Sequence, residues 1–444
     1  MAKILLIGYL PPNLISNSKI EAANYRTWQF AGPLLSEGHQ IYLCAKSLSP
    51  AKSEVSIPPE WQNDLTVQIM PFHTPHWRGL LQKVHDRFKP DVVVAVNFDS
   101  CLYATKLSTD RPIWMDIYGD PLTIMQAAFY RAGSDRGLPT SIDFLRQALR
   151  KGDKFSVCGF KQRDMLVGEL AMAGRLNYHS FGYQFVEVIF PGALPKKTID
   201  TDKRRKKPNL QRLGIKPEDF VVLWCGGYNT WTDVDTLFSG LEWAMQEDAR
   251  IHYVSIGENT YQASDNVYSR FLDRIAHSTN PSRYHMLGWR PWSEIDGFYS
   301  ESDVGINIDA LHYETIYGTR TRLLEMMAAG LPIITSLGSE LSYMMSENEV
   351  SFSFEIGNWK NLGEEIYLLA NNPGLLEKLS SKSLAFTNNQ LSFMSTSAPI
   401  RSWVLSPSLA PDQLKDRREK WLGLSHKGRS IIRRTLWEVL GSDK

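Results

Sequence analysis

The feature that most constrains the fold is a regular alternation of short apolar runs with helix-like segments, in two series separated by a charged connector. A helix-like segment over 20–37 follows the first apolar run, and Gly38 ends it before the second run. Strands that alternate with helices indicate βαβ units, and therefore a parallel sheet with helices on both faces. The strands expected in the first series cover 3–8, 40–44, 65–70, 92–96, 113–116, 154–158 and 186–190.

The connector spans 191–215 and contains a basic run at 203–207, which is typical of an exposed linker between domains. The strands expected after it cover 220–225, 252–256, 284–287, 304–308, 333–335 and 350–354, with helices at 233–246, 293–301, 319–329 and 359–371. The chain is therefore predicted to be an α/β protein. It would have two doubly wound Rossmann-like domains, 1–195 and 196–400, facing across a cleft.

The composition excludes several classes of protein. A formal net charge of +1 over 444 residues argues against wholesale nucleic-acid binding. The four cysteines are far apart, so we expect buried thiols and a reducing, cytoplasmic compartment. No stretch of about 20 apolar residues occurs, so no membrane-spanning helix is expected. No histidine-rich cluster is evident, so we expect no metal and no cofactor.

Residues 317–335 carry the most chemical information in the second half. We expect Tyr317, Gly318 and Thr319 to lead into a helix, with Arg320 and Arg322 near its start. Arginines bind phosphate oxygens, and a carboxylate on the same helix face accepts bonds from vicinal hydroxyls. With Glu325 on that face, the segment suits a diphosphate joined to a ribose. The structural alternative is an arginine–glutamate pair on a packed helix.

Two loops of the second half complete the candidate donor site. Gly226 and Gly227 follow a strand and let a phosphate approach the backbone, with Asn229 next to them. Trp289 follows another strand and suits stacking near a base, with Arg290 beside it. A tight turn and a core tryptophan are the respective structural alternatives.

In the first half, Asp116 and Asp120 flank the end of a strand, where carboxylates orient sugar hydroxyls or take a proton. Capping of the next helix is the structural alternative for Asp120. Tyr25 and Arg26 belong to a polar and aromatic helix surface that suits contact with an acceptor sugar.

These motifs resemble the GT-B glycosyltransferases, and family 4 among them, over roughly 1–400. In that family the second domain binds a nucleotide-sugar and the first binds the acceptor. Glu325, followed by Met-Met-Ala-Ala-Gly-Leu-Pro, resembles the family's glutamate that holds the ribose hydroxyls. The family's other glutamate would fall at Tyr317, and Glu314 is the nearest acid. The triplet at 116–118 resembles an Asp-Leu-Tyr motif of some relatives, which favours Asp116 near the reacting centre.

The resemblance implies transfer of a sugar, with retention, from a nucleoside diphosphate sugar to a saccharide or a lipid-linked acceptor. Asp116, Glu314 and Arg322 are the expected catalytic residues. A sugar-nucleotide 2-epimerase and a non-catalytic sugar-nucleotide-binding protein are the alternatives.

The resemblance also implies that the segment 401–444 returns to pack on the first domain as a basic amphipathic helix. Its part from 415 onward holds nine basic and four acidic residues, a net charge of +5, interleaved with apolar residues such as Trp421 and Trp437. Contact with an anionic membrane surface on the cytoplasmic side is a further expectation.

Overall fold

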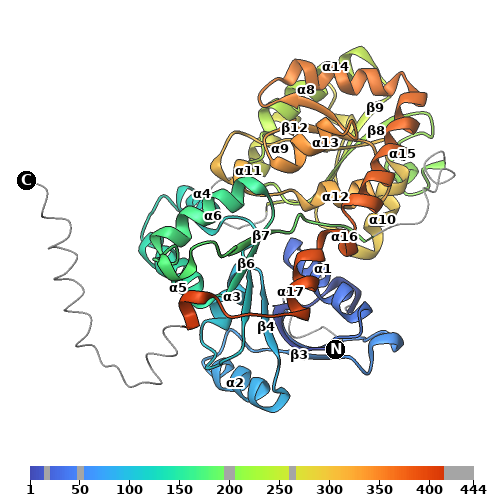
Figure 1. Ribbon diagram of the computed structural model, residues 1–444. Coiled ribbons are helices and arrows are strands. Elements are labelled where there is room, and N and C mark those ends of the chain that lie inside the picture. Colours follow the sequence, from blue (N-terminus) through green and yellow to red (C-terminus); the bar gives the residue numbers. More distant parts are fainter. Residues whose placement is uncertain (15–20, 48–54, 195–205, 260–266, 415–444) are drawn as a thin grey trace, which may run out of the picture.

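The computed structural model describes residues 1–14, 21–47, 55–194, 206–259 and 267–414. They form two parallel sheets with helices on both faces of each, stacked as two domains (Figure 1). The first sheet has the strand order β3-β2-β1-β4-β5-β6-β7, and the second has the order β10-β9-β8-β11-β12-β13. The predicted fold class is therefore confirmed.

The elements of the first domain are as follows. The strands are β1 (Lys3–Tyr9), β2 (Gln40–Lys46), β3 (Leu65–Ile69), β4 (Val92–Val96), β5 (Ile113–Asp116), β6 (Lys154–Val157) and β7 (Val186–Val188). The helices are α1 (Ala22–Ser36), α2 (Trp77–Phe88), α3 (Phe98–Ala104), α4 (Pro121–Ala132), α5 (Leu138–Lys151) and α6 (Phe160–Met172), with short 3₁₀ turns η1 (Pro12–Leu14), η2 (Pro59–Trp61) and η3 (Tyr178–Ser180).

The elements of the second domain and the end of the chain follow. The strands are β8 (Phe220–Cys225), β9 (Ile251–Ile256), β10 (Tyr284–Met286), β11 (Val304–Asn307), β12 (Ile333–Leu337) and β13 (Phe352–Glu355). The helices are α8 (Val234–Glu247), α9 (Val267–Ala276), α10 (Trp292–Glu301), α11 (Tyr313–Tyr317), α12 (Thr321–Ala328), α13 (Glu340–Glu347), α14 (Trp359–Ala370), α15 (Pro373–Gln390), α16 (Phe393–Thr396) and α17 (Ala398–Leu405), with 3₁₀ turns η4 (Leu210–Leu213) and η5 (Pro281–Arg283).

Burial on both faces explains the continuous apolar runs of the strands. Every residue of β4 is buried, because α1 covers one face of the first sheet and α3, α5 and α6 contribute to the cover of the other. The second sheet is likewise enclosed between α8, α9 and α14 on one face and α12, α13 and α15 on the other. Burial of each large apolar side chain stabilises the fold by about 1.5–3 kcal/mol, so the packing of helices on the sheets holds each domain together.

The loops after the strands bring the carboxyl ends of the two sheets face to face. Tyr118, after β5, shares a hydrogen bond of 2.8 Å with Thr321 at the start of α12. Arg131, in α4, donates to Thr230, after β8, at 2.9 Å. The predicted cleft between the domains therefore lies at the ends of β5 and β8.

The start of the helix near Glu325 was predicted wrongly. The expected helix begins at Gly318 and Thr319, but α12 begins at Thr321 with Arg320 as its N-terminal flanking residue. Gly318 instead ends the short helix α11, where its N–H donates to Glu314 O at 2.7 Å. The reason is that the buried side chain of Arg320 is paired with Asp309 and Glu314, which precede the helix in sequence. Arg320 therefore belongs to the turn before α12 and not to the helix itself.

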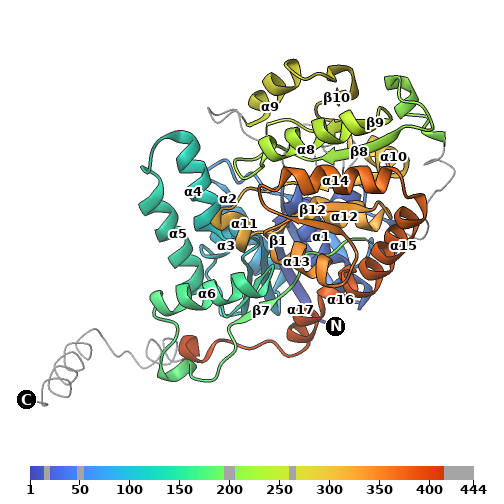
Figure 2. The same cartoon turned by 90° about the horizontal axis from the view of Figure 1, so that it is seen from above.

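The chain returns to the first domain after α15, as predicted. Figure 2 shows α16 and α17 beside α1, and the Trp403 ring meets Trp114 of β5 at 5.4 Å between centroids. The predicted boundary after 195 falls between β7 and β8 and stays a prediction, as does the boundary at 400. The predicted helix from 415 onward lies outside the described residues.

Candidate functional site

The glycine loop after β8 forms one side of the candidate donor site. Gly226 has φ +133°, a conformation that other residues rarely adopt. A Cβ on Gly226 would lie 3.2 Å from the guanidinium carbon of Arg322, and one on Gly257 would lie 2.2 Å from Gly226 O. The glycines therefore allow Arg322 to approach the loop closely.

Arg322 sits in the first turn of α12 with its guanidinium stacked 4.2 Å from the centroid of the Trp224 ring. Its Nη2 donates to Gly227 O at 2.9 Å, but its Nη1 is buried without a hydrogen-bond partner. Burial lowers the pKa of Arg322, and neighbouring Arg320 adds to this effect. A buried cationic N–H without an acceptor is unfavourable, so an anionic oxygen bound here would be stabilised.

Arg320 lies beside Arg322 and is fully paired. Its Nε donates to both carboxylate oxygens of Asp309 at 2.9 Å, and Nη1 and Nη2 donate to Glu314 at 3.0 and 2.8 Å. Burial opposes the charge of Arg320, but the carboxylates of Asp309 and Glu314 outweigh it and raise the pKa. The structure thus places Arg320 and Glu314 together in a buried ion cluster. Their predicted contacts with substrate stay predictions.

Glu325 lies one helical turn after Arg322, with 8% of its surface exposed. It is next to Tyr25 of α1, whose pKa is raised first by burial and then by the charge of Glu325. The Tyr25 ring also meets Trp292 of α10 edge to face, at 5.4 Å between centroids. The predicted acceptor residue Tyr25 is therefore brought to the predicted donor residue Glu325.

The other residues predicted to bind the donor differ in how deeply they are buried. Asn229 is half-buried, and its N–H donates to Thr232 Oγ1 at 3.1 Å within the turn. Trp289 is 42% exposed and Arg290 is exposed, on the loop after β10. Tyr317 is half-buried with its ring 6.4 Å from that of Tyr313, and the buried Oγ1 of Thr319 has no hydrogen-bond partner.

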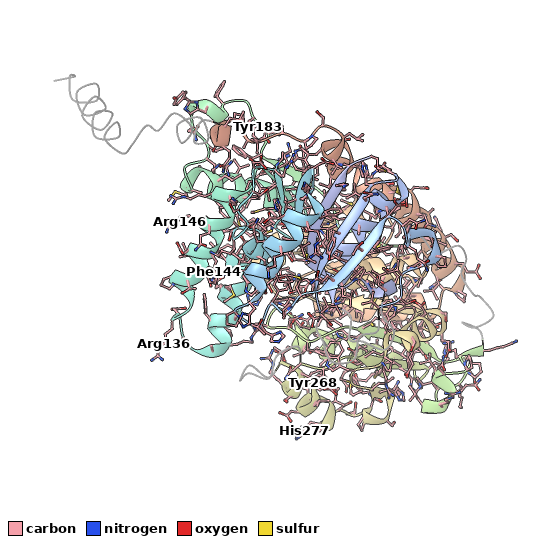
Figure 3. The ribbon with its side chains drawn as sticks, turned by 90° about the horizontal axis from the view of Figure 1, so that it is seen from below. Arg136, Phe144, Arg146, Tyr183, Tyr268 and His277 are labelled. Carbon is pink, nitrogen blue, oxygen red and sulfur yellow. The ribbon has the colours of Figure 1, made fainter. Side chains whose placement is uncertain are left out.

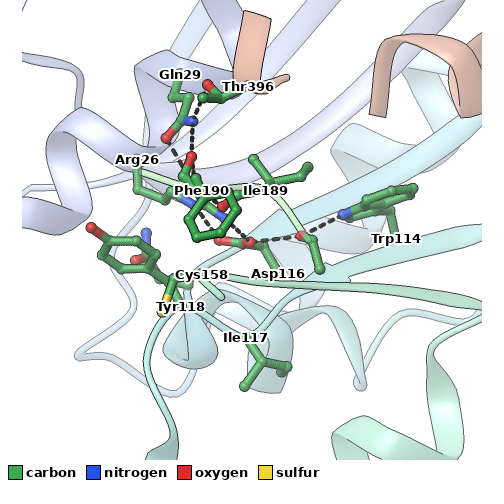
Figure 4. A network of polar contacts seen from close by, with 12 residues as sticks. Arg26, Gln29, Trp114, Asp116, Ile117, Tyr118, Cys158, Ile189, Phe190 and Thr396 are labelled. Atoms are coloured by element: carbon green, nitrogen blue, oxygen red, sulfur yellow. Dashed lines mark hydrogen bonds and ion pairs between the residues drawn. The ribbon is translucent and has the colours of Figure 1, made fainter. Parts of the chain in front are cut away.

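In the first domain, Asp116 and Arg26 form a buried ion pair (Figure 4). Arg26 Nη2 and Nε donate to the two oxygens of Asp116 at 2.7 and 3.0 Å, and Ser156 donates to the same carboxylate at 2.6 Å. Arg26 Nη1 donates to Ile189 O at 2.8 Å, which anchors the chain as it leaves the domain. Both side chains are fully committed to protein partners, which favours a structural role, and their predicted contacts with an acceptor stay predictions.

Asp120 begins α4, and its carboxylate accepts the Thr123 N–H at 2.6 Å. This is the structural alternative that the sequence offers for Asp120. Burial raises the pKa of the nearby Glu169 to about 8, and the charge of Asp120 adds to the effect.

A cavity of about 500 Å³ lies between the domains. One helix face of α4 forms a wall, and residues after β8 and β11 form the other. Among the lining residues that the structure describes, Glu314 is the one carboxylate, and Arg320 already holds it; His312 is the one imidazole. The lining consists of Thr123, Gln126, Ala127, Tyr130, Thr230, Trp231, Leu311, His312, Tyr313, Glu314 and Ile316.

Sequence reasoning missed the contact that Glu340 makes across the domain boundary. Its two carboxylate oxygens accept the backbone N–H groups of Phe160 and Lys161 at 2.9 and 3.0 Å, at the first turn of α6. A Cβ on Gly159 would lie 2.5 Å from this carboxylate, so glycine is needed there. The sequence signals only a helix start at Ser339–Glu340, not its partner in the other domain.

In the described residues no group of three or more His, Cys, Asp or Glu side chains could hold a metal ion. The expectation that no metal is needed stays a prediction. Over the same described parts of the chain, no helix has both the length and the apolar character to cross a bilayer.

Comparisons with known proteins address the predicted resemblance. Residues 219–372 match the family model described as Glycosyl transferases group 1. No curated protein sequence gives a significant match.

Solved structures extend the comparison to nearly the whole chain. HepE of Anabaena, in complex with UDP-glucose, is 15% identical, with a TM-score of 0.62 and coverage of 91% of this chain and 100% of that one. Sucrose-phosphate synthase of Thermosynechococcus elongatus is 14% identical, with a TM-score of 0.66 and coverage of 90% and 98%. WaaG, a glycosyltransferase involved in lipopolysaccharide biosynthesis, is 14% identical, with a TM-score of 0.57 and coverage of 91% and 100%. Residues 219–372 therefore match a Glycosyl transferases group 1 domain, and the described residues have the two-domain GT-B fold.

Proposed function

We propose that the protein is a glycosyltransferase that moves a hexose from a nucleoside diphosphate sugar to a saccharide or lipid-linked saccharide. The observation that carries this proposal is the buried, unpartnered Nη1 of Arg322, beside the glycine loop and at the start of α12. A diphosphate would satisfy this N–H and the free backbone N–H groups of the helix start. Glu325, one turn later, would accept the ribose hydroxyls.

Arg322 would also assist the reaction itself. Negative charge accumulates on the diphosphate as the bond to the sugar breaks, and a positioned guanidinium stabilises that charge. Each charge-assisted hydrogen bond of this kind contributes about 1.5–3 kcal/mol. Retention of the anomeric configuration is proposed from the family resemblance, as is independence from a metal ion.

The cavity between α4 and the loops after β8 and β11 is the proposed acceptor site. Its aromatic side chains, including Trp231 and Tyr313, suit the apolar faces of sugar rings, and Gln126 and Thr123 suit their hydroxyls. HepE also binds UDP and glucose together, and WaaG acts in lipopolysaccharide biosynthesis. Both similarities support a saccharide acceptor, and the second supports one attached to a lipid.

A thermal-shift screen against UDP, GDP, ADP and dTDP sugars tests donor binding. A donor at about a hundred times its dissociation constant should add about 2.7 kcal/mol to the free energy of unfolding. Arg322→Ala should reduce the shift to about half or less, whereas Arg212→Ala, at an exposed arginine outside the site, should keep it. If Arg322→Ala retains the full shift, the diphosphate binds elsewhere.

Product analysis then separates the three candidate functions. Transfer that needs an acceptor and survives EDTA supports the proposal. Conversion of the donor without any acceptor indicates a 2-epimerase, and tight donor binding with neither transfer nor hydrolysis indicates a binding protein.

A further inference from the structure

Tyr118 links the two domains at the edge of the cleft, and the proposed function assigns no role to it. Its hydroxyl shares a hydrogen bond of 2.8 Å with Oγ1 of Thr321, which lies 203 residues later in the chain. Thr321 is the first residue of α12, the helix that carries Arg322 and Glu325. The hydrogen bond therefore joins the first domain to the helix on which the proposed diphosphate site depends.

The side chain of Tyr118 is held in place from within its own domain. The guanidinium of Arg26 lies 4.7 Å from the centroid of the Tyr118 ring, and Asp116 holds that guanidinium with two hydrogen bonds (Figure 4). A cation over the face of an aromatic ring is attracted to it. The backbone carbonyl of the preceding residue, Ile117, accepts a hydrogen bond of 2.8 Å from Gln162. The buried ion pair thus orients the ring that reaches across the cleft.

On the other side of the cleft, Thr321 lies between the two arginines of the second domain. Arg320, which precedes it, is fixed by the buried carboxylates with which it pairs. Arg322, which follows it, donates to Gly227 O at 2.9 Å but keeps its Nη1 without a partner. The hydrogen bond at Thr321 therefore restrains the turn that carries the unpaired guanidinium.

We infer that Tyr118 is a positioning residue that holds the first turn of α12 against the first domain, and so keeps the cleft closed over a bound nucleotide-sugar. Closure brings an acceptor on one domain to a donor on the other, and small displacements of reacting groups slow a reaction strongly. The expected effect on turnover rests on the proposed function. The contact itself can be tested without donor or acceptor.

Distances between the domains test the contact directly. Arg146→Cys on α5 and His277→Cys directly after α9 give one exposed labelling site on each domain, and the native cysteines are buried or half-buried (Figure 3). Tyr118→Phe keeps the ring and loses the hydroxyl, so it should broaden the distribution of distances between two spin labels. Thr321→Val removes the partner hydroxyl and should have the same effect. The double variant should be no broader than either single variant, because both remove one hydrogen bond.

Hydrogen exchange at the start of α12 gives a second measure of the same contact. Amides there should exchange roughly two- to tenfold faster in Tyr118→Phe and Thr321→Val, the range expected when one neutral hydrogen bond is lost. Tyr42→Phe is the matched control, because the Tyr42 hydroxyl donates to Gln68 at 2.7 Å within the first domain. This control, and Thr321→Ser, which keeps the hydroxyl, should match the unmodified chain in both measurements. Unchanged distances and exchange in Tyr118→Phe would overturn the inference.

Kinetic measurements then connect the contact to the proposed reaction. Tyr118→Phe and Thr321→Val should lower kcat roughly two- to tenfold and change the dissociation constant of the donor by less than about twofold. The reason is that Arg322 and Glu325 bind the donor from the second domain alone. A loss of donor affinity with unchanged kcat would overturn the positioning role. Faster exchange in the variants, with no transfer even by the unmodified chain, would count against the proposed function and support the contact between the domains.

Discussion

The two domains each place an arginine near the end of a strand at the cleft, and the two arginines differ in their partners. Arg26 in the first domain gives its N–H groups to Asp116, Gln29 and Ile189 O, and it is 1% exposed. Arg322 in the second domain keeps one buried N–H without a partner. The difference indicates that the first arginine serves folding and the second serves a ligand, because an unpaired buried cation is costly unless an anion binds to it.

The largest expected effect is therefore on stability, at the first arginine. Arg26→Ala leaves the buried carboxylate of Asp116 without its ion partner, and breaking such a pair costs about 3–5 kcal/mol. Denaturant unfolding should show this loss of free energy. Asp116→Asn should also destabilise the fold, since Arg26 then loses its counter-charge. A stable, inactive Arg26→Ala protein would contradict the comparison and restore Arg26 as an acceptor residue.

The next effect is on binding, at the second arginine. Arg322→Ala should weaken binding of the preferred nucleotide-sugar by about 1.5–3 kcal/mol, because at least one charge-assisted hydrogen bond is lost. Titration calorimetry measures this change, and the free energy of unfolding without ligand should change little. Arg320→Ala should behave in the opposite way, since it leaves Asp309 and Glu314 buried without their shared cation. Equal effects of both substitutions on ligand binding would show that the arginines act as one site.

The sequence alone predicts the fold far better than it separates these arginines. The strands of the described residues were all expected, because each is an apolar run between helix signals, and those runs are buried on both faces. The helical spacing of Arg322 and Glu325 was also readable. Arg320 could not be told from Arg322, because its partner Asp309 follows another strand and is brought to it only by the folded sheet.

Contacts between the domains could not be predicted from the sequence, for a related reason. The cavity wall on α4 and the carboxylate of Glu340 face partners more than a hundred residues away in sequence. No local pattern of residues encodes such a placement, which depends on how the two sheets meet.

A pH titration sharpens the comparison within the first domain at Glu169, whose carboxylate is buried near that of Asp120. Its pKa is raised to about 8 in the folded state, by burial and then by Asp120, against about 4.5 in the unfolded chain. Because the folded state binds this proton more tightly than the unfolded chain does, protonated Glu169 contributes to the free energy of unfolding. This contribution is fully present below about pH 4.5 and is lost as the pH rises toward 8. Stability should therefore fall over this window, with a slope of at most about 1.4 kcal/mol per pH unit from this group. Glu169→Gln should flatten the slope, measured by urea unfolding at several pH values, and an unchanged slope would contradict the assignment.

The smallest expected effect concerns the contact that joins the two domains. Glu340 caps the first turn of α6 from the other domain, and removal of a side-chain cap typically costs about 1 kcal/mol. Glu340→Ala should shift the domains toward a more open arrangement, seen as a larger radius of gyration in X-ray scattering, with weaker binding of a donor that contacts both domains. Glu340→Gln keeps one oxygen acceptor and should lie between the two. The Lys161 ammonium stacks 4.8 Å from the Tyr343 ring beside this cap, so Tyr343→Leu is a control that keeps the carboxylate and loses only the stacking. If Glu340→Ala scatters like the unmodified chain while Arg322→Ala still loses donor binding, the cap is local to α6 and the ligand site works without it.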